Sequence, residues 1–327
     1  MQTAVAKDGG RGRLARTRVL DVTVLMGGPS TEREVSLISG GAVSAALERL
    51  GHKVTRSDIN STDLSALDRP GIDVVFIALH GAFGESGEVQ ELCERRGLAY
   101  TGSGPRASKL AMDKVLARAQ FQQAGLLCAA GVHVRAGQDL ASYRSRVDAL
   151  GLPAVVKPVD GGSSVDLTIA RDAASRDASL AAVLAKYSQV LVEQYVAGIE
   201  VTVGILDQQA LPPIQIVPSG EFYDYTAKYA DGSGTQYRFD LPTPATTVQE
   251  LQAGALRAYQ ALGCRDMSRV DFIITPAGQC FVLEANTIPG FTSHSLLPMA
   301  AAKAGLSFDQ LVSRLLEMAL ARRDKPI

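Results

Sequence analysis

Four polar residues stand at alternate positions on two apolar stretches near the carboxyl end of the chain. If residues 276–279 form the turn of an antiparallel hairpin, Asp271 faces Glu284 and Arg269 faces Asn286, all on one face. Two carboxylates and a carboxamide that converge repel one another unless a hard cation lies between them. The pattern therefore predicts a site for Mg²⁺ or Mn²⁺ carried with a nucleotide; the alternative is a solvated strand face with a surface ion pair.

The same hairpin makes two further predictions about the residues around the polar positions. The pair next to the turn is expected to be Thr275 with Cys280. The residues between the polar positions are apolar and are expected on the opposite face of the hairpin. They are Val270, Phe272, Leu283 and Ala285.

A lysine and a run of small residues form the second candidate site. Lys157 ends a short apolar stretch, and Gly161, Gly162, Ser163 and Ser164 follow it. The backbone N–H groups of such a turn, together with one ammonium group, can bind a phosphate. The order of residues differs from that of a P-loop, so the segment is either a phosphate-binding loop of another kind or a plain solvated turn.

Two residues near the amino end have positions typical of functional sites. Glu32 stands at the start of a predicted helix, where the helix dipole stabilises a carboxylate, although an ordinary first-turn Glu has the same position. His80 ends a buried strand and precedes Gly81, at the edge of a parallel sheet where ligands commonly bind. Farther along, residues 219–236 form either a lid or an aromatic-packed loop.

A strand–helix–strand unit is predicted to position the amino-terminal residues. Apolar residues at helical spacing follow the first strand and end at Gly51, and Thr31 with Glu34 has the spacing of a capping box. This order of elements predicts a parallel sheet. The strands are predicted at residues 19–25, 53–59 and 72–79.

The rest of the chain alternates helices and strands at longer intervals. One continuous helix is predicted over residues 106–123 and another over 248–262, and further helical segments run to about Ala321. A strand is expected near Val132. The remaining strands are predicted at residues 154–157, 190–196, 200–206, 269–274 and 280–286.

The composition of the 327 residues limits the class of protein. The 33 Lys and Arg against 34 Asp and Glu give a net charge of −1, which argues against a nucleic-acid binder that neutralises phosphates. No apolar run approaches the ~20 residues that span a bilayer, so no membrane contact is expected. Four scattered cysteines indicate reduced thiols in a cytoplasm, and residues 1–18 are expected to be a disordered basic tail.

Longer motifs occur in a fixed order along the chain, and together they resemble those of one family. The motifs are Gly27-Gly28-x-Ser30-x-Glu32-Arg33-Glu34-Val35-Ser36, Ala78-Leu79-His80-Gly81, Tyr100-Thr101-Gly102-Ser103, Met112-Asp113-Lys114, Tyr223-Asp224-Tyr225-x-Ala227-Lys228-Tyr229, Glu284-Ala285-Asn286-Thr287-x-Pro289-Gly290 and Thr292-Ser293-His294-Ser295. They resemble the D-alanine–D-alanine ligases, and the resemblance covers Val19 to about Ala321.

The resemblance implies an α/β and α+β fold class, with a parallel-sheet α/β domain followed by a two-domain ATP-grasp fold. The implied divisions are 19–104 for the amino-terminal substrate domain, 105–194 for the central ATP-grasp domain and 195–327 for the carboxyl-terminal one. The last of these would contain an ω-loop and the metal site. The resemblance also implies a homodimer in a bacterial cytoplasm.

The resemblance also implies roles for individual residues around ATP, two Mg²⁺ or Mn²⁺ ions and D-alanine. The residues implied for ATP are Lys114, Lys157, Ser163, Glu193, Val196, Glu200 and Lys228. Those implied for the metals are Asp271, Glu284 and Asn286. Those implied for the first D-alanine and for catalysis are Glu32, His80, Ser163, Tyr229, Arg269 and Gly290. Those implied for the second substrate are Ser295 and Leu296.

The implied reaction joins two D-alanine molecules at the expense of ATP. ATP would phosphorylate the first D-alanine, and the amine of the second would attack the acyl phosphate while Arg269 stabilises the oxyanion. The products would be D-alanyl-D-alanine, ADP and phosphate for peptidoglycan precursors. The alternatives are an enzyme that accepts D-lactate, D-serine or another residue, which Tyr229 argues against, and a non-catalytic ATP-binding relative.

The sequence departs from the family pattern in the small-residue loop. Asp166 stands where the family usually has Gly, Asp160-Gly161 replaces a more basic or Glu-containing pair, and Gln194 replaces a frequent lysine. A carboxylate beside phosphates would repel them. Asp166→Gly is therefore expected to tighten or leave unchanged the KM for ATP, unless another residue compensates Asp166.

Overall fold

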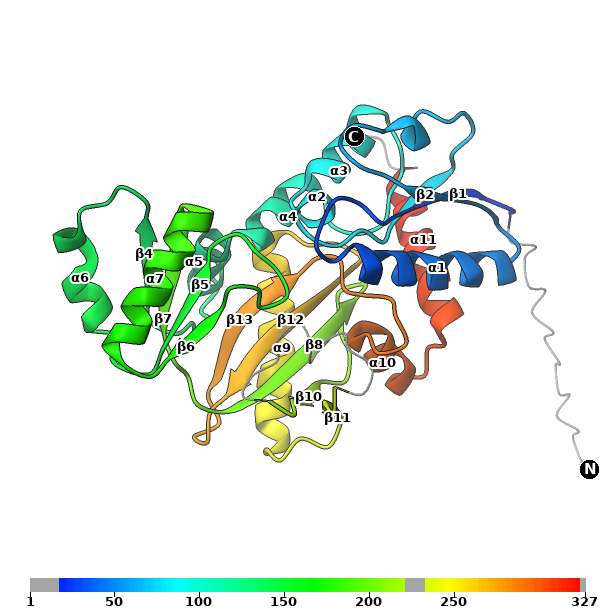
Figure 1. The fold of residues 1–327 in the computed structure, drawn as a ribbon. Helices are drawn as coiled ribbons and strands as arrows, with labels where there is room; N and C mark the ends of the chain where they lie inside the picture. Colours follow the sequence, from blue (N-terminus) through cyan, green and yellow to red (C-terminus); the bar gives the residue numbers. More distant parts are fainter. Residues whose placement is uncertain (1–17, 221–232, 324–327) are drawn as a thin grey trace, which may run out of the picture.

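A computed structural model of the chain describes residues 18–220 and 233–323, and three sheets organise them. A three-stranded sheet lies at the amino-terminal side, a four-stranded sheet lies at the opposite side, and the largest sheet lies between them (Figure 1). The mixed α/β and α+β fold class is therefore confirmed. Among the described residues, no helix is long and apolar enough to cross a membrane.

The amino-terminal sheet contains the predicted strand–helix–strand unit. Its strands run parallel in the order β2-β1-β3, so the predicted parallel sheet is confirmed. The predicted capping box is wrong: Glu32 is the N-cap of the helix, and no side chain caps it. The elements are β1 (Asp21–Met26), α1 (Arg33–Arg49), β2 (Lys53–Asp58), η1 (Ser65–Leu67), β3 (Val74–Ile77), α2 (Ala82–Glu85) and α3 (Glu88–Arg95).

The single helix predicted over residues 106–123 is wrong, because two helices meet at Asp113. The backbone of Asp113 is extended, and its carboxylate accepts hydrogen bonds of 2.9 Å from the N–H groups of Val115 and Leu116. Asp113 thus caps a new helix rather than continuing the old one. The two helices are α4 (Pro105–Met112) and α5 (Lys114–Gln123).

The four-stranded sheet has the order β4-β7-β5-β6, with antiparallel pairs throughout. It contains the strands predicted near Val132 and at 154–157 and 190–196. Helix α7 and strand β6 were not predicted. The elements are β4 (Gly131–Arg135), α6 (Leu140–Asp148), β5 (Ala154–Pro158), β6 (Thr168–Ala170), α7 (Ala173–Tyr187) and β7 (Gln189–Gln194).

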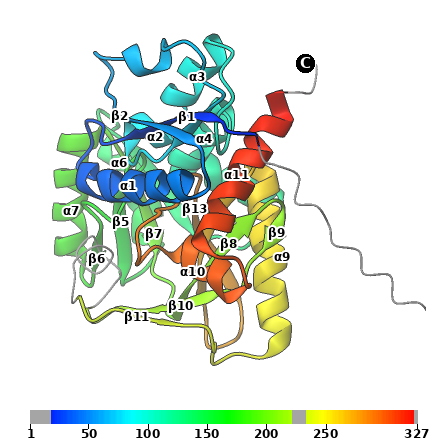
Figure 2. The same cartoon turned by 90° about the vertical axis from the view of Figure 1, so that its right-hand side faces the viewer.

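The largest sheet has the order β11-β10-β8-β12-β13, with the short β9 paired to β8. Helix α9 covers one of its faces, and α10 and α11 connect it to the amino-terminal unit (Figures 1 and 2). The elements are β8 (Ile199–Leu206), β9 (Gln209–Ala210), β10 (Ile214–Val217), β11 (Gln236–Arg238), α9 (Ala245–Leu262), β12 (Met267–Ile274), β13 (Cys280–Asn286), α10 (Leu296–Lys303) and α11 (Phe308–Arg323).

The hairpin of β12 and β13 has the predicted register at its polar end and a different register near the turn. Asp271 faces Glu284 and Arg269 faces Asn286, as predicted. A shift between Asp271 and Phe272 then pairs Cys280 with Ile274, so the predicted pair of Thr275 with Cys280 is wrong. This shift is a β-bulge that leaves Leu283 without a paired residue on β12. Leu283 lines a cavity on the polar side of the hairpin, so its predicted place on the opposite face is wrong.

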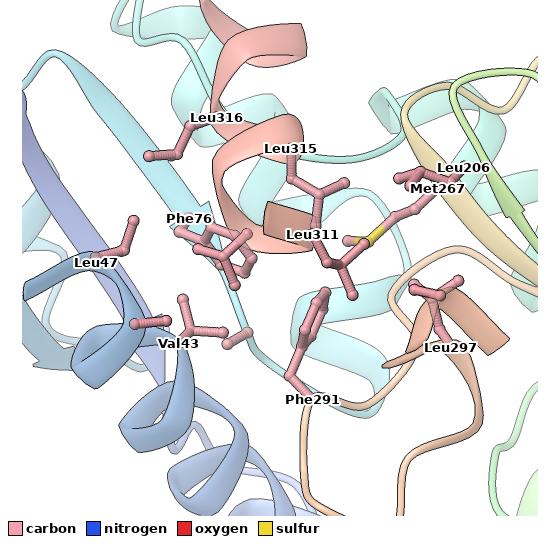
Figure 3. Close-up of a cluster of buried hydrophobic side chains, with 14 of the residues drawn as sticks. Val43, Leu47, Phe76, Leu206, Met267, Phe291, Leu297, Leu311, Leu315 and Leu316 are labelled. Atoms are coloured by element: carbon pink, nitrogen blue, oxygen red, sulfur yellow. The ribbon is translucent and has the colours of Figure 1, made fainter. Parts of the chain in front are cut away.

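One apolar cluster joins the amino-terminal sheet to the carboxyl-terminal helices (Figure 3). The ring of Phe76, from β3, meets that of Phe291 edge-on, with centroids 5.4 Å apart. Leu47, from α1, and Leu315, from α11, belong to the same buried cluster. This packing holds the loop around Phe291 against the edge of the parallel sheet at which His80 lies.

Candidate active site

The main cavity lies between the four-stranded sheet and the largest sheet and measures about 370 Å³. Its walls are largely apolar and carry charged groups at one end, which is typical of a site for a small molecule with an apolar ring and a charged tail. The apolar lining includes Val155, Leu167, Ile169, Tyr195, Val196, Ile216, Ile273 and Leu283. The charged lining residues are Lys114, Lys157, Glu193, Glu200, Asp271 and Glu284.

A second cavity, of about 50 Å³, adjoins the first and reaches the amino-terminal unit. Lys114, Gly161, Gly162 and Glu284 line both cavities, so the two form one continuous site. Residues from all three sheets or their loops meet there. The second cavity also has Glu32, Glu85, Ser163, Arg269 and Asn286 in its walls.

The polar face of the β12–β13 hairpin closes one end of this site. Arg269 donates two hydrogen bonds to the carboxylate of Asp271, with N–O distances of 3.0 and 2.9 Å. Thr202 on the neighbouring strand β8 donates a third, of 2.5 Å, to the same carboxylate. Asn286 accepts a hydrogen bond of 2.9 Å from the N–H of Ile288. Asp271 is thus buried and fixed in place by these donors.

This donor set fits a hard divalent cation that arrives with a nucleotide. No group of three His, Cys, Asp or Glu side chains suited to a metal occurs within the described ranges. Asp271 and Glu284 face each other across the hairpin, however, and Asn286 adds a neutral oxygen next to them. Two carboxylates and one amide leave coordination positions for phosphate oxygens, which is how Mg²⁺ is usually held.

Two buried lysines line the same cavity as these carboxylates. Lys157 lies next to the carboxyl end of β5 and forms an ion pair with Glu193. Lys114 begins α5 and donates to the carbonyl oxygen of Gly161. Burial lowers the pKa of Lys114, and the charge of Glu284 partly opposes this effect. A polyanion placed beside Lys114 would favour its charged form.

Arg118 is a structural support of this charged end that sequence reasoning missed. It forms an ion pair with Glu193 and donates to the carbonyl oxygen of Ala129. Arg118, Glu193 and Lys157 are 8%, 5% and 8% exposed, so the three charges compensate one another away from water.

We expect Arg118→Met to lower the free energy of unfolding in urea by about 3 kcal/mol, because it leaves Glu193 with one partner in a buried place. The matched control is Arg95→Met, which removes an exposed pair with Glu91 one helical turn away. The control is expected to cost at most about 0.5 kcal/mol. Equal losses in the two variants would contradict the assignment of Arg118 to a buried charge cluster.

The small-residue loop connects the central unit to the amino-terminal one. Ser163 donates a hydrogen bond to the carboxylate of Glu32, which is itself buried at the start of α1. The sequence-predicted residues Glu32 and Ser163 are therefore brought together from 131 positions apart. Ser164 and Val165 of this loop line the larger cavity together with Lys114 and Lys157.

His80 is buried beside the smaller cavity and is held by two side chains. Its Nε2 lies 3.4 Å from Ser39 Oγ, and its Nδ1 lies 3.3 Å from Glu85 Oε1. The pKa of Glu85 is raised, mainly because its carboxyl group is buried and in smaller part because of the charge of Glu32. The hydrogen bond with His80 opposes this shift. Sequence reasoning missed Glu85, although its spacing from His80 at the start of a helix was a usable signal.

Gly290 lies next to these residues, within the loop that Phe291 fixes. A Cβ built on Gly290 would lie 2.6 Å from Ser295 Oγ and 4.0 Å from His80 Nε2. Ser295 is the N-cap of α10 and accepts a hydrogen bond of 2.9 Å from the N–H of Thr292. Leu296 follows as the first helical residue, and its side chain packs in the core.

Because Ser295 must move to admit the new methyl group, we expect Gly290→Ala to raise about tenfold or more the KM for the second substrate that the family resemblance places at this turn. The melting temperature should change little. Gly41→Ala is the control, because a Cβ there meets nothing within 4 Å. Steady-state kinetics with that substrate varied measures the effect, and unchanged kinetics for both variants would contradict a role of this turn in substrate binding.

The structure thus gathers most of the sequence-predicted site residues around one pair of cavities. The predictions for Lys228 and Tyr229, and for the rest of the ω-loop motif from Tyr223, lie outside the described residues. The predicted tail also lies outside them, apart from Arg18, which pairs with Asp73. Besides Arg118 and Glu85, the lining or supporting residues that sequence reasoning missed include Thr202, Ile273 and Gln215.

A parallel amino-terminal unit followed by two sheets that enclose a cavity, with lysines and carboxylates at its charged end, defines an enzyme of the ATP-grasp class. A family model described as the carboxyl-terminal part of D-Ala–D-Ala ligase matches residues 121–317. A D-alanine–D-alanine ligase of Syntrophotalea carbinolica is 46% identical over 302 residues, which span 92% of this chain and 97% of that one. The chain belongs to the D-alanine–D-alanine ligase family, as the resemblance predicts.

Solved structures agree with this assignment. The D-alanine–D-alanine ligase of Bacillus anthracis superposes with a TM-score of 0.82 at 33% identity, covering 93% of this chain and 99% of that one. The same enzyme complexed with ATP gives a TM-score of 0.81 at 31% identity over the same shares of the two chains. The predicted assignment to a family of ligases is therefore confirmed.

Proposed function

We propose that the chain joins two D-alanine molecules through a D-alanyl phosphate, using ATP, and so supplies D-alanyl-D-alanine for peptidoglycan precursors. The observation that carries this proposal is the continuity of the two cavities. The larger one has lysines and carboxylates at its charged end, and the smaller one adds Glu32, Ser163 and Arg269. A nucleotide and an amino acid can therefore meet at a shared wall.

The nucleotide is proposed to lie in the larger cavity. Its apolar walls suit an adenine ring, which Glu193 and Val196 would edge, while Glu200 would bind the ribose hydroxyls. Lys114 and Lys157 would bind the phosphates, because two buried ammonium groups stabilise a polyanion strongly. The backbone of the loop at Ser163 would add N–H donors.

Asp271, Glu284 and Asn286 are proposed to hold two Mg²⁺ or Mn²⁺ ions. When bound, these ions neutralise the charge of the phosphate oxygens during phosphoryl transfer. Asp271 is held ready by Thr202 and Arg269, so its carboxylate needs little rearrangement.

The first D-alanine is proposed to lie in the smaller cavity. Its ammonium group would pair with the Glu32 carboxylate, which Ser163 orients through its hydroxyl. His80 would lie near the substrate, oriented by Glu85 and Ser39. This arrangement would direct the substrate carboxylate toward the phosphates between the lysines.

The bond-forming steps follow from charge. A carboxylate oxygen of the first D-alanine attacks the γ-phosphorus of ATP, and ADP leaves. The amine of the second D-alanine then attacks the acyl carbon, and the carbonyl oxygen becomes an oxyanion. Arg269 and the Gly290 N–H are proposed to stabilise that oxyanion, while phosphate leaves and the amine loses a proton. Ser295 and Leu296, at the start of α10, would receive the second carboxylate.

Several parts of this proposal rest on the family resemblance alone. Lys228 would reach the γ-phosphate, and Tyr229 would complete the network of Glu32 and Ser163. The domain divisions at 104 and 194, a homodimer and a cytoplasmic location are proposed on the same ground. Size-exclusion chromatography with light scattering tests the dimer, and a monomeric mass at micromolar concentration would contradict it.

Isotope transfer tests the acyl phosphate directly. With D-alanine that carries ¹⁸O in both carboxylate oxygens, one ¹⁸O is expected in each phosphate released. The carboxylate oxygen that attacked phosphorus stays bonded to it when the acyl C–O bond breaks. Mass spectrometry of the phosphate gives the answer. Dipeptide formed with unlabelled phosphate would contradict the intermediate while leaving the overall reaction intact.

A further inference from the structure

The loop that follows Lys157 has an unusual backbone for its residue types. Ser163, Ser164 and Asp166 have φ values of +53°, +56° and +56°. Side chains other than glycine adopt this left-handed region at a cost, although Asp tolerates it better than most. Three such residues within four positions remain in place only when their surroundings hold them.

Asp166 supplies one of the contacts that hold this loop. Its Oδ2 accepts hydrogen bonds of 2.5 Å from Lys186 Nζ and of 2.5 Å from the Tyr187 hydroxyl. Lys186 also lies 5.0 Å from the centroid of the Tyr187 ring. These partners lower the pKa of the Asp166 carboxyl, so it is charged at neutral pH. The carboxylate pairs with α7, and Ser164 and Val165 line the cavity instead.

The partners of Asp166 stand on a rigid part of the fold. Lys186 and Tyr187 end α7, which begins with a capping box at Asp172. Tyr187 packs against the buried cluster of the four-stranded sheet. Helix α7 also packs on β5, the strand that ends with Lys157 and Pro158. Asp166 therefore ties the loop to the same body that carries Lys157.

We infer that Asp166, Lys186 and Tyr187 form an anchor that positions the 163–166 loop for the phosphates of the nucleotide. Asp166 is a positioning residue, since its side chain lies outside the cavity lining. The inference rests on the proposed function, in which this loop binds phosphate. It reverses the expectation from sequence: Asp166→Gly removes the anchor, and the KM for ATP should rise rather than fall.

Variants of the two partners test the anchor without changing the loop itself. Lys186→Met and Tyr187→Phe should each raise the KM for ATP about twofold to fivefold, as expected for half-exposed contacts, with kcat changed less than twofold. Tyr187→Phe keeps the ring in the cluster. The matched control is Arg144→Met, which removes exposed ion pairs with Asp148 and Asp177 on the same unit. Its KM should equal that of the wild type.

A double-mutant cycle separates anchoring from general stability. Asp166→Asn keeps a residue that tolerates positive φ but removes the charge. The effects of Asp166→Asn and Lys186→Met on the KM for ATP should then not be additive. The double variant should have a KM no higher than that of the single variant with the higher KM. Additive effects, or an unchanged KM in Lys186→Met, would overturn the inference.

Binding of ADP with Mg²⁺, measured by calorimetry, distinguishes this outcome from a failure of the proposed function. If the wild type binds ADP but forms no dipeptide, the proposed reaction fails and the anchor is judged by ADP affinity alone. Lys186→Met should then weaken ADP binding about twofold to fivefold, while Arg144→Met should not. Equal ADP affinity in wild type and Lys186→Met would contradict the anchor whatever the activity.

Discussion

Arg269→Ala is expected to lower kcat about 10²- to 10³-fold while the dissociation constant for ATP changes less than threefold. Arg269 lines the smaller cavity beside Asn286, away from the apolar walls that suit an adenine ring. Removing one group that stabilises an oxyanion typically costs a factor of about 10²–10³ in kcat. The loss therefore appears in the chemical step and not in nucleotide binding.

Two further variants make this prediction specific. Arg269→Lys keeps the charge but loses the double hydrogen bond to Asp271, so kcat is expected to fall between those of the wild type and the alanine variant. Arg257→Ala, on the exposed side of α9, is the control for loss of a positive charge and should behave as the wild type. Stopped-flow and steady-state assays measure kcat, and calorimetry measures ATP binding. Equal losses of kcat and ATP affinity in Arg269→Ala would contradict the oxyanion role.

Glu284→Gln is expected to lower kcat by at least about 100-fold and to raise the Mg²⁺ concentration needed for half-maximal activity by a similar factor. The substitution keeps the size of the side chain but removes one of the two facing carboxylate charges. It also removes the charge that opposes the lowering of the Lys114 pKa. Metal binding and phosphate binding are thus both weakened at one end of the cavity.

Magnesium titrations of activity and a metal-binding assay check this prediction. Glu317→Gln, on the exposed face of α11, provides the control for loss of a carboxylate, since its side chain is 61% exposed. Raising Mg²⁺ should restore part of the activity of Glu284→Gln and leave the control unchanged. A variant with normal Mg²⁺ dependence would remove Glu284 from the metal site.

Local pattern predicts the parts of this site in which neighbours in sequence are neighbours in space. The facing of Asp271 and Glu284 follows from strand alternation on either side of a short turn. The bulge at Leu283 does not follow from this alternation, because it inserts one extra residue of β13 between the partners of Asp271 and Phe272. A single register shift there moves one apolar side chain into the cavity wall.

Contacts between residues far apart in the sequence could not be predicted from any local sequence pattern. Glu32, just before α1, meets Ser163, in the loop between β5 and β6, across 131 positions of sequence, and no short motif encodes that contact. The orientation of Asp166 is set by a positive φ and by partners on α7, twenty positions away. The sequence therefore indicates a carboxylate in a phosphate-binding loop but not that the carboxylate pairs with a helix instead.

Incubation of the purified full chain with ATP, Mg²⁺ and D-alanine, followed by measurement of ADP and dipeptide, tests the proposed reaction most directly. The predicted result is one ADP, one phosphate and one D-alanyl-D-alanine per turnover, with no ADP formed when D-alanine is omitted. Offering D-serine and D-lactate beside D-alanine checks the acceptor in the same assay, and D-alanine should be preferred. ADP without dipeptide, or no ADP at all, would contradict the central claim.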